Sequence, residues 1–290
     1  MTHRPQAALP ALVAAAALLT LAAPSRPAAA QEIETLEMRE YKACMSLINV
    51  DPDQAFEAAL QLQDRGGGAP AKHCAAAALA AAGHNEEAAK RFEALATDMP
   101  DSTPPAIVAE ILGHAGVAWL SADAPAKAYT VQTAAIDLAP DSPDILIDRA
   151  VTLNELNRLW EAIDDLDRAL QLDSTRVDAL TLRASAYRQL EVLDLALESA
   201  NRALELDPDN PEALLERGAV HRLAGELDAA RADWIRLIEK HDGRPAAEMA
   251  RRICARLISS RRVPSSTVRG RRGASTALRS TSIVYISRFG

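Results

Sequence analysis

The apolar and polar positions between Pro143 and Asn210 follow one pattern twice, at an offset of thirty-four residues. The shared positions are Leu146, Arg149, Ala150, Leu153, Ala162, Leu166, Ala169 and Leu172, followed by Leu180, Arg183, Ala184, Tyr187, Ala196, Ala200, Ala203 and Leu206. Within each copy the apolar residues recur at steps of three and four in two runs, and a polar break such as residues 154–159 separates the runs. Each copy therefore predicts two helices joined by a tight turn. A unit of this size becomes stable only by stacking on further copies.

Small residues mark the places where the two helices of a unit come closest. Ala150 and Ala162 occupy these places, and the helical runs end before Pro140 and Pro208, where a proline cannot extend a helix. The pattern resembles the tetratricopeptide repeat family, which has small residues at unit positions 8 and 20, large ones at 4, 11 and 24, and a proline near 32. This resemblance implies an all-α fold, an α-α superhelix of about six helix-turn-helix repeats with a C-terminal capping helix. The alternative is two unrelated amphipathic hairpins that happen to align.

The same pattern divides residues 31–258 into a predicted solenoid. Its units cover approximately residues 36–68, 69–108, 109–142, 143–176, 177–210 and 211–244, followed by a cap at 245–258. In the first unit Pro52 would open the second helix, and residues 101–105 add a short insertion after the second unit. Gln132 occupies a position that usually holds a large apolar residue, which predicts that its helix is shifted or partly exposed. Arg252 replaces a small residue in the cap, so the outer side of the cap should face water.

The first thirty residues have the features of a secretory signal peptide. A basic start at Arg4 precedes an apolar stretch from Ala7 to Ala23, and small residues end at Ala30. We predict cleavage after Ala30 and a mature protein that is periplasmic or secreted, of the exported bacterial type. The competing interpretation is a transmembrane anchor, but the stretch is short for one. After cleavage no stable membrane span is expected.

Charge separates the end of the chain from the rest. Residues 256–290 hold eight arginines and no acidic residue, which predicts a basic disordered tail from residue 259 to 290. Such a run is usually solvated; binding to acidic lipid or nucleic acid and an accidental change of reading frame are the alternatives. Residues 31–255 hold all forty acidic residues against twenty-two Lys and Arg, a net charge of −18. Nucleic acid is therefore excluded as a ligand of the solenoid, and a basic or weakly charged protein fits better.

Motifs for catalysis, cofactors and metals are missing from the sequence. No nucleophile elbow, dinucleotide loop or zinc-binding helix occurs, and the histidines show no metal-ligand spacing with one another: His73, His84, His114, His221 and His241. We therefore predict a protein that is not an enzyme and needs no cofactor. A site assembled from distant residues without a motif remains the alternative.

Two sets of residues have predicted structural roles. Cys44 and Cys74 lie on the first helices of adjacent units, where an oxidising periplasm would let them form a disulfide, and two buried thiols are the alternative. Cys254 would be left over. Three arginines share one unit position and two aspartates another, which predicts that the pairs Arg149–Asp165 and Arg217–Asp233 join the two helices of their units, and ligand binding is the alternative. Their contribution to stability should be modest if they are exposed.

The resemblance also implies where a partner would bind. In tetratricopeptide proteins the first helices of successive units line a concave groove that holds an extended peptide or a partner helix. The corresponding positions here are Asp144, Ile147, Val151, Asn154, Asp178, Thr181, Ser185, Arg188, Glu212, Leu215, Ala219 and Arg222. Ile147 and Val151 replace the lysine and asparagine with which some members clamp a C-terminal carboxylate, so capture of such a tail is not expected.

The predicted function is a non-catalytic periplasmic adaptor that binds protein or peptide partners in cell-envelope assembly or maintenance. An accessory subunit of an envelope enzyme is the alternative, and self-association through the repeats stays open.

Overall fold

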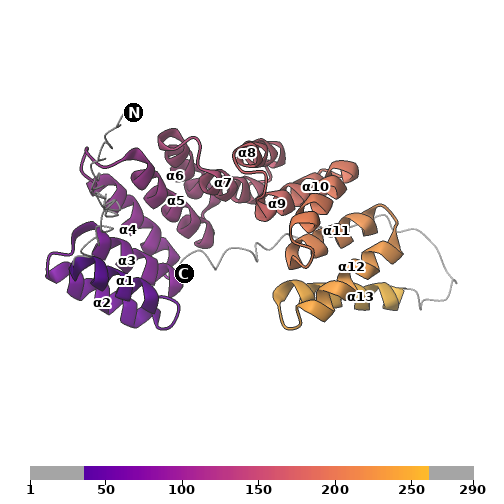
Figure 1. The fold of residues 1–290 in the computed structure, drawn as a ribbon, viewed down its shortest axis with the longest axis horizontal. Coiled ribbons are helices and arrows are strands. Elements are labelled where there is room, and N and C mark those ends of the chain that lie inside the picture. Colours follow the sequence, from indigo (N-terminus) through magenta and orange to yellow (C-terminus); the bar gives the residue numbers. More distant parts are fainter. Residues whose placement is uncertain (1–35, 261–290) are drawn as a thin grey trace, which may run out of the picture. The chain divides into compact units, whose positions relative to one another are not determined.

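The described part of the chain, residues 36–260 of the computed structural model, consists of thirteen α-helices and contains no strand (Figure 1). The helices are α1 (Leu36–Leu47), α2 (Pro52–Asp64), α3 (Gly68–Ala81), α4 (Asn85–Asp98), α5 (Pro105–Ser121), α6 (Pro125–Leu138), α7 (Pro143–Glu155), α8 (Leu159–Leu172), α9 (Val177–Gln189), α10 (Leu193–Leu206), α11 (Pro211–Leu223), α12 (Leu227–Lys240) and α13 (Pro245–Ser260). The predicted all-α class is confirmed. The predicted signal peptide lies outside the described residues, and so does the predicted tail from residue 261 onward.

The helices stack as hairpins in chain order to form an α-α superhelix. Each helix packs against the next one in the chain, and most first helices also pack against the first helix of the following hairpin, as α7 does against α9. Six hairpins run from α1–α2 to α11–α12, and α13 packs on the last of them. Prolines open six of these helices at their first turn, where the missing N–H costs nothing: Pro52, Pro105, Pro125, Pro143, Pro211 and Pro245. Helix α5 begins at Pro105, at the last residue of the expected insertion and four residues before the predicted start of the third unit at residue 109.

The turn inside a hairpin is set by one residue with a positive φ. Its φ lies between 57° and 84° in the second to sixth hairpins, at Gly83, Asp123, Asn157, Glu191 and Gly225. The N–H of the next residue then donates to a carbonyl five residues earlier, for example from Arg158 to Leu153 at 2.8 Å. This bond closes the end of the first helix and reverses the chain. The hairpin therefore has a local cause that recurs from the second unit to the sixth.

The close approach of the two helices is confirmed at the predicted small residues. Ala150 and Ala184 of the first helices are buried, and so are Ala162, Ala196 and Ala230 of the second helices. Two hairpins have glycine in place of the first-helix alanine. At Gly218 an added Cβ would lie 2.3 Å from Nε1 of Trp234, so the indole fills the space that an alanine would take.

The expectation that Gln132 shifts or exposes its helix is wrong. Helix α6 is in register, and the Gln132 side chain is fully buried against Gly116, where an added Cβ would lie 2.4 Å from its Cγ. The absence of a side chain at Gly116 makes room for the long glutamine. Both amide atoms of Gln132 lack a hydrogen-bond partner within residues 36–260.

Two glycines on α5 give opposite predictions for one substitution. Gly116→Ala should lower the free energy of unfolding by about 1–2 kcal/mol, because its Cβ forces Gln132 out of a packed core. Gly113→Ala is the matched control: its nearest atom, Cγ1 of Ile145, lies at an ordinary 3.6 Å, so the helix-forming alanine should raise stability by about 0.5–1 kcal/mol. Urea unfolding followed by circular dichroism measures both. Equal effects would contradict the packing of α5 on α6.

Both predicted ion pairs are present, and each is a two-bond contact. Arg149 donates from Nε and Nη2 to Asp165 at 2.8 and 2.7 Å, and Arg217 donates in the same way to Asp233 at 2.8 and 2.6 Å. Both aspartates are buried, so these are not the exposed pairs whose contribution to stability would be modest. The remaining Nη1 of each arginine reaches back to the preceding hairpin, to Thr133 from Arg149.

The third arginine extends the same arrangement. Arg183 donates from Nε to Oγ of Ser199 at 3.1 Å and from Nη1 to Asp167 of the preceding hairpin at 2.6 Å. We call Arg149, Arg183 and Arg217, with these partners, the arginine ladder. Each arginine bonds both its own second helix and the one before it, so the ladder joins hairpins as well as helices.

Candidate partner-binding face

We call the twelve predicted contact positions on α7, α9 and α11 the first-helix face. Three of them are buried, namely Ile147, Val151 and Thr181. Ile147 belongs to the core around Leu146 and Ala150, and Thr181 donates its hydroxyl to the Val177 carbonyl at 2.8 Å. These three side chains pack inside the solenoid and cannot reach a partner as they stand. The other nine are partly or fully exposed, and their contact with a partner stays a prediction.

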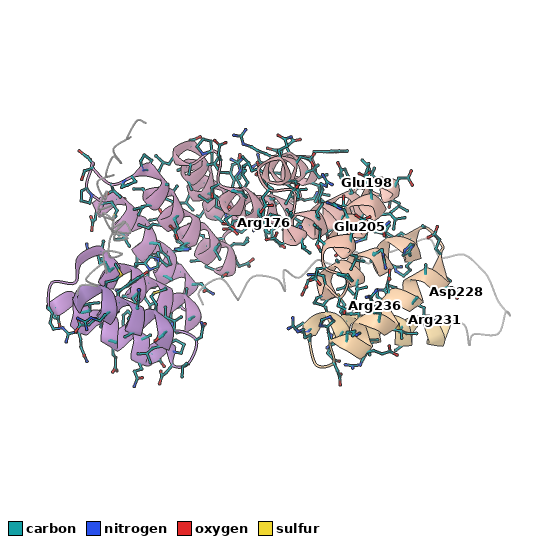
Figure 2. The ribbon with its side chains drawn as sticks, in the orientation of Figure 1. Arg176, Glu198, Glu205, Asp228, Arg231 and Arg236 are labelled. Carbon is teal, nitrogen blue, oxygen red and sulfur yellow. A yellow bond between two sulfur atoms is a disulfide. The ribbon has the colours of Figure 1, made fainter. Side chains whose placement is uncertain are left out.

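Polar residues of the face join α7 to α9. Arg176 donates from Nη1 to Asp144 at 2.9 Å and from Nη2 to Asp178 at 2.7 Å, and it lies at the start of α9 (Figure 2). The hydrogen bond with Asp178 and the charge of Asp178, followed by the charge of Asp144, raise the pKa of the Arg176 guanidinium, whereas partial burial lowers it. At the other end of α9, Nε2 of Gln189 donates to Oδ1 of Asn154 at 2.6 Å. Both ends of the α7–α9 contact are therefore held by side chains of this face or beside it.

A second polar group joins α9 to α11. Arg188 donates from Nε to Oε2 of Glu216 at 2.6 Å, and the Ser185 hydroxyl donates to Oε1 at 3.2 Å. The sequence did not single out Glu216, because its role depends on which residues of the preceding hairpin face it. A partner carboxylate would compete with Glu216 for Nε and Nη2 of Arg188.

The last hairpin has two charged side chains that form no ion pair with a neighbouring helix. The side chains of Glu212 and Arg222 on α11 make no hydrogen bond or ion pair with any residue from 36 to 260. Leu215 and Ala219 lie between them on the same helix and are partly exposed. This stretch of α11 offers an apolar surface with an acidic group at one end and a basic group at the other.

The structure also brings together three aromatic polar residues whose contact the sequence did not predict. The Tyr41 hydroxyl lies 3.1 Å from Nδ1 of His73, and Nε2 of His73 lies 3.2 Å from Nδ1 of His114, so the contacts connect α1, α3 and α5. Burial, together with His114, lowers the pKa of His73 to about 4, while Glu110 acts in the opposite direction. His73 is therefore neutral near pH 7. Among the described residues no group of three or more His, Cys, Asp or Glu is placed to hold a metal ion.

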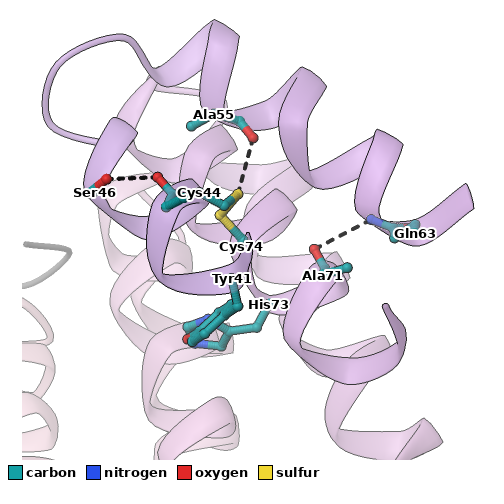
Figure 3. The surroundings of a disulfide bond; sticks show 9 residues. Tyr41, Cys44, Ser46, Ala55, Gln63, Ala71, His73 and Cys74 are labelled. Atoms are coloured by element: carbon teal, nitrogen blue, oxygen red, sulfur yellow. Dashed lines mark hydrogen bonds between the residues drawn. A yellow bond between two sulfur atoms is a disulfide. The ribbon is translucent and has the colours of Figure 1, made fainter. Parts of the chain in front are cut away.

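A disulfide between Cys44 on α1 and Cys74 on α3 lies beside this group (Figure 3). Both cysteines are buried, and Sγ of Cys44 lies 3.3 Å from the Ala55 carbonyl oxygen on α2. The bond connects the first hairpin to the second. Cys254 on α13 is a free thiol, and partial burial raises its pKa.

No helix within residues 36–260 combines the length and the apolar character that crossing a membrane requires.

The family comparison matches one part of the chain. Residues 184–225, from α9 to the turn after α11, match the model of the TPR repeat. No curated protein matches the chain.

Several solved structures resemble this chain at low sequence identity. The structure of the APC/C hetero-tetramer Cut9–Hcn1 is 14% identical over 74% of this chain and 45% of its own, with a TM-score of 0.56. A crystal structure of MamA is 19% identical over 57% of this chain and 92% of its own, with a TM-score of 0.49. The first TPR of Spaghetti (RPAP3), bound to an HSP90 peptide, is 26% identical over 40% of this chain and 93% of its own, with a TM-score of 0.39. The stacked hairpins and the similarity to the Cut9–Hcn1 structure show an all-α solenoid, and residues 184–225 within it match the TPR repeat.

Proposed function

We propose that this protein is a non-catalytic periplasmic scaffold that binds a protein or peptide partner through the first-helix face, in the assembly or maintenance of the cell envelope. The observation that carries the proposal is the row of exposed and partly exposed side chains on α7, α9 and α11, which the stacking of first helices holds in a fixed order. A surface of this kind binds extended segments by shape and by polar pairing along its length.

The exposed part of α11 defines the chemistry of the partner segment most closely. Glu212 and Arg222 offer unpaired charges of opposite sign, and Leu215 with Ala219 offers an apolar strip between them. An amphipathic helix or extended peptide with a basic group near one end and an acidic group near the other fits this surface. Arg188 and Glu216 already neutralise each other and would add specificity only if the partner separates them.

Two independent features favour work outside the cytoplasm. The signal-like residues 1–30 predict export, and the buried Cys44–Cys74 disulfide is a feature of proteins that fold in an oxidising compartment. Fractionation of cells tests this directly: the processed chain, beginning at Gln31, should be found in the periplasmic or secreted fraction. Retention of the unprocessed chain in the cytoplasm would overturn the proposed location.

Site-specific crosslinking in intact cells tests the binding face. A photo-crosslinking residue at Ser185, Ala219 or Arg222 should capture one discrete protein, identified by mass spectrometry. The same residue at Glu205 on α10, exposed on a second helix (Figure 2), is the control and should not capture it. Capture of a discrete partner from position 205 alone would assign binding to the second helices instead. An accessory role beside an enzyme would appear as an envelope enzyme among the captured proteins.

A further inference from the structure

An exposed tryptophan stands out on α8. Trp160 has 58% of its surface exposed, whereas Trp119 and Trp234 are buried. Its ring lies 6.4 Å from the ring of Tyr187 on α9, with the two planes at 80°. A large aromatic side chain that stays in water beside a second ring offers a surface on which a flat cation can stack.

Carboxylates surround this aromatic pair. Asp164 and Asp167 follow Trp160 at intervals of four and seven residues on α8, so all three lie on one stripe of the helix. Glu198 is exposed on α10 (Figure 2). Burial raises the pKa of the Tyr187 hydroxyl, and the negative charges of Asp167, Glu198 and Asp164 act in the same direction, whereas Arg183 lowers it.

Two of the three carboxylates have no cation of their own. Asp167 is paired with Arg183 at 2.6 Å. The side chains of Asp164 and Glu198 make no hydrogen bond or ion pair within residues 36–260. We call Trp160, Asp164, Tyr187 and Glu198 the Trp160 patch. Two aromatic rings with two unpaired carboxylates match the guanidinium group, which stacks on rings and donates to carboxylates at once.

The chain itself supplies such groups. Residues 261–290 contain seven arginines and neither lysine nor any acidic residue, against the charge of −18 on residues 31–255. The segment begins directly after α13, and thirty extended residues span up to about 100 Å. Because the segment is attached to α13, its binding to any surface within this reach is intramolecular, and short flexible linkers give effective concentrations of about 1 mM.

We propose that the arginine-rich segment 261–290 docks on the Trp160 patch of its own chain, with one guanidinium stacked on the exposed ring of Trp160 and paired with Asp164 and Glu198. The inference goes beyond the proposed function and does not depend on it. It gives the basic segment a binding site on the acidic solenoid.

A photo-crosslinking residue in place of Trp160, in the full-length mature chain, tests the contact. The expected product joins position 160 to a peptide from residues 261–290, with a yield that does not change on dilution and falls in 1 M sodium chloride. The same crosslinker at Leu138, an exposed apolar residue on α6, is the control and should give no such product. A product without peptides from this segment would overturn the proposal. So would a dimer product whose yield rises with concentration, because that would place the segment of a second copy on the patch.

Fluorescence of the full-length chain gives a second readout. Trp160 is the exposed tryptophan, so docking should protect it from acrylamide. We expect the quenching of its emission to rise about twofold in Asp164→Asn/Glu198→Gln, and also when the seven arginines of residues 261–290 are changed to glutamine. The matched control Glu57→Gln/Glu239→Gln removes two exposed charges from α2 and α12 and should leave quenching unchanged. Equal quenching in all four proteins, with equal circular dichroism, would show that the patch is empty.

Discussion

Asp233→Ala should lower the free energy of unfolding by about 3 kcal/mol, because it leaves the Arg217 guanidinium without its two-bond partner in a largely dry position. The Asp233 side chain is 8% exposed and that of Arg217 is 23% exposed, so little water can replace the lost carboxylate. The remaining bond from Arg217 to Asn201 cannot neutralise the charge. Urea unfolding followed by circular dichroism at pH 7 measures the loss.

The control for this prediction is on the same helix. Asp228 pairs with Arg231 at 3.2 Å, but its side chain is 97% exposed (Figure 2). Asp228→Ala should therefore change stability by less than about 0.5 kcal/mol. A loss at Asp233 no larger than the loss at Asp228 would show that the arginine ladder does not hold the last hairpins together.

The parts of the fold that the sequence predicts are those that depend on contacts within one unit. Ala150 and Ala162 are close because they face each other across one hairpin, and the pair Arg149–Asp165 forms for the same reason. A residue pattern that repeats with a fixed offset contains this information in each copy. The turn residue with positive φ also depends on contacts within one unit.

The contacts that sequence reasoning missed join different units. The Arg188–Glu216 pair and the His73–His114 contact each depend on how one hairpin sits on the next, and no spacing inside a unit reports this. The bonds from the ladder arginines to the preceding hairpin are missed for the same reason. Gln132 is a different case, because the glycine that accommodates it is visible in the sequence at the facing position.

The sequence predicted which side of each first helix the face residues lie on, but not which of them are exposed. Unit position alone places Ile147 and Val151 on the same side of α7 as Asp144 and Asn154. Their burial follows from apolar side chains that neighbouring helices cover, whereas the polar residues at the two ends of the helix stay partly accessible. On α7, therefore, only the polar residues at the two ends of the helix remain accessible to a partner. The accessible part of the first-helix face lies more on α11.

Loss of the disulfide should have an effect as large as loss of the buried aspartate. The bond closes a loop with a sequence separation of 30, and the entropy that it removes from the unfolded chain corresponds to about 3–4 kcal/mol. Reduction by dithiothreitol, or Cys44→Ala, should lower the free energy of unfolding by this amount. In the reduced protein the Cys44 thiol can donate to the Ala55 carbonyl at 3.3 Å, so the loss should come mainly from the unfolded chain and not from a broken contact.

The position of the bond decides which part of the protein responds. It connects the first hairpin to the second, and in a solenoid each repeat is held chiefly by its neighbours. Reduction should therefore release α1 and α2 before the remaining helices, and limited proteolysis should cut first near residues 49–51 in the reduced protein and not in the oxidised one. Cys254→Ser is the control and should change neither stability under oxidising conditions nor the cleavage pattern, because Cys254 takes no part in the bond. Uniform proteolysis along the chain after reduction would show that the hairpins unfold as one unit, and that the disulfide stabilises the whole solenoid rather than its first repeat.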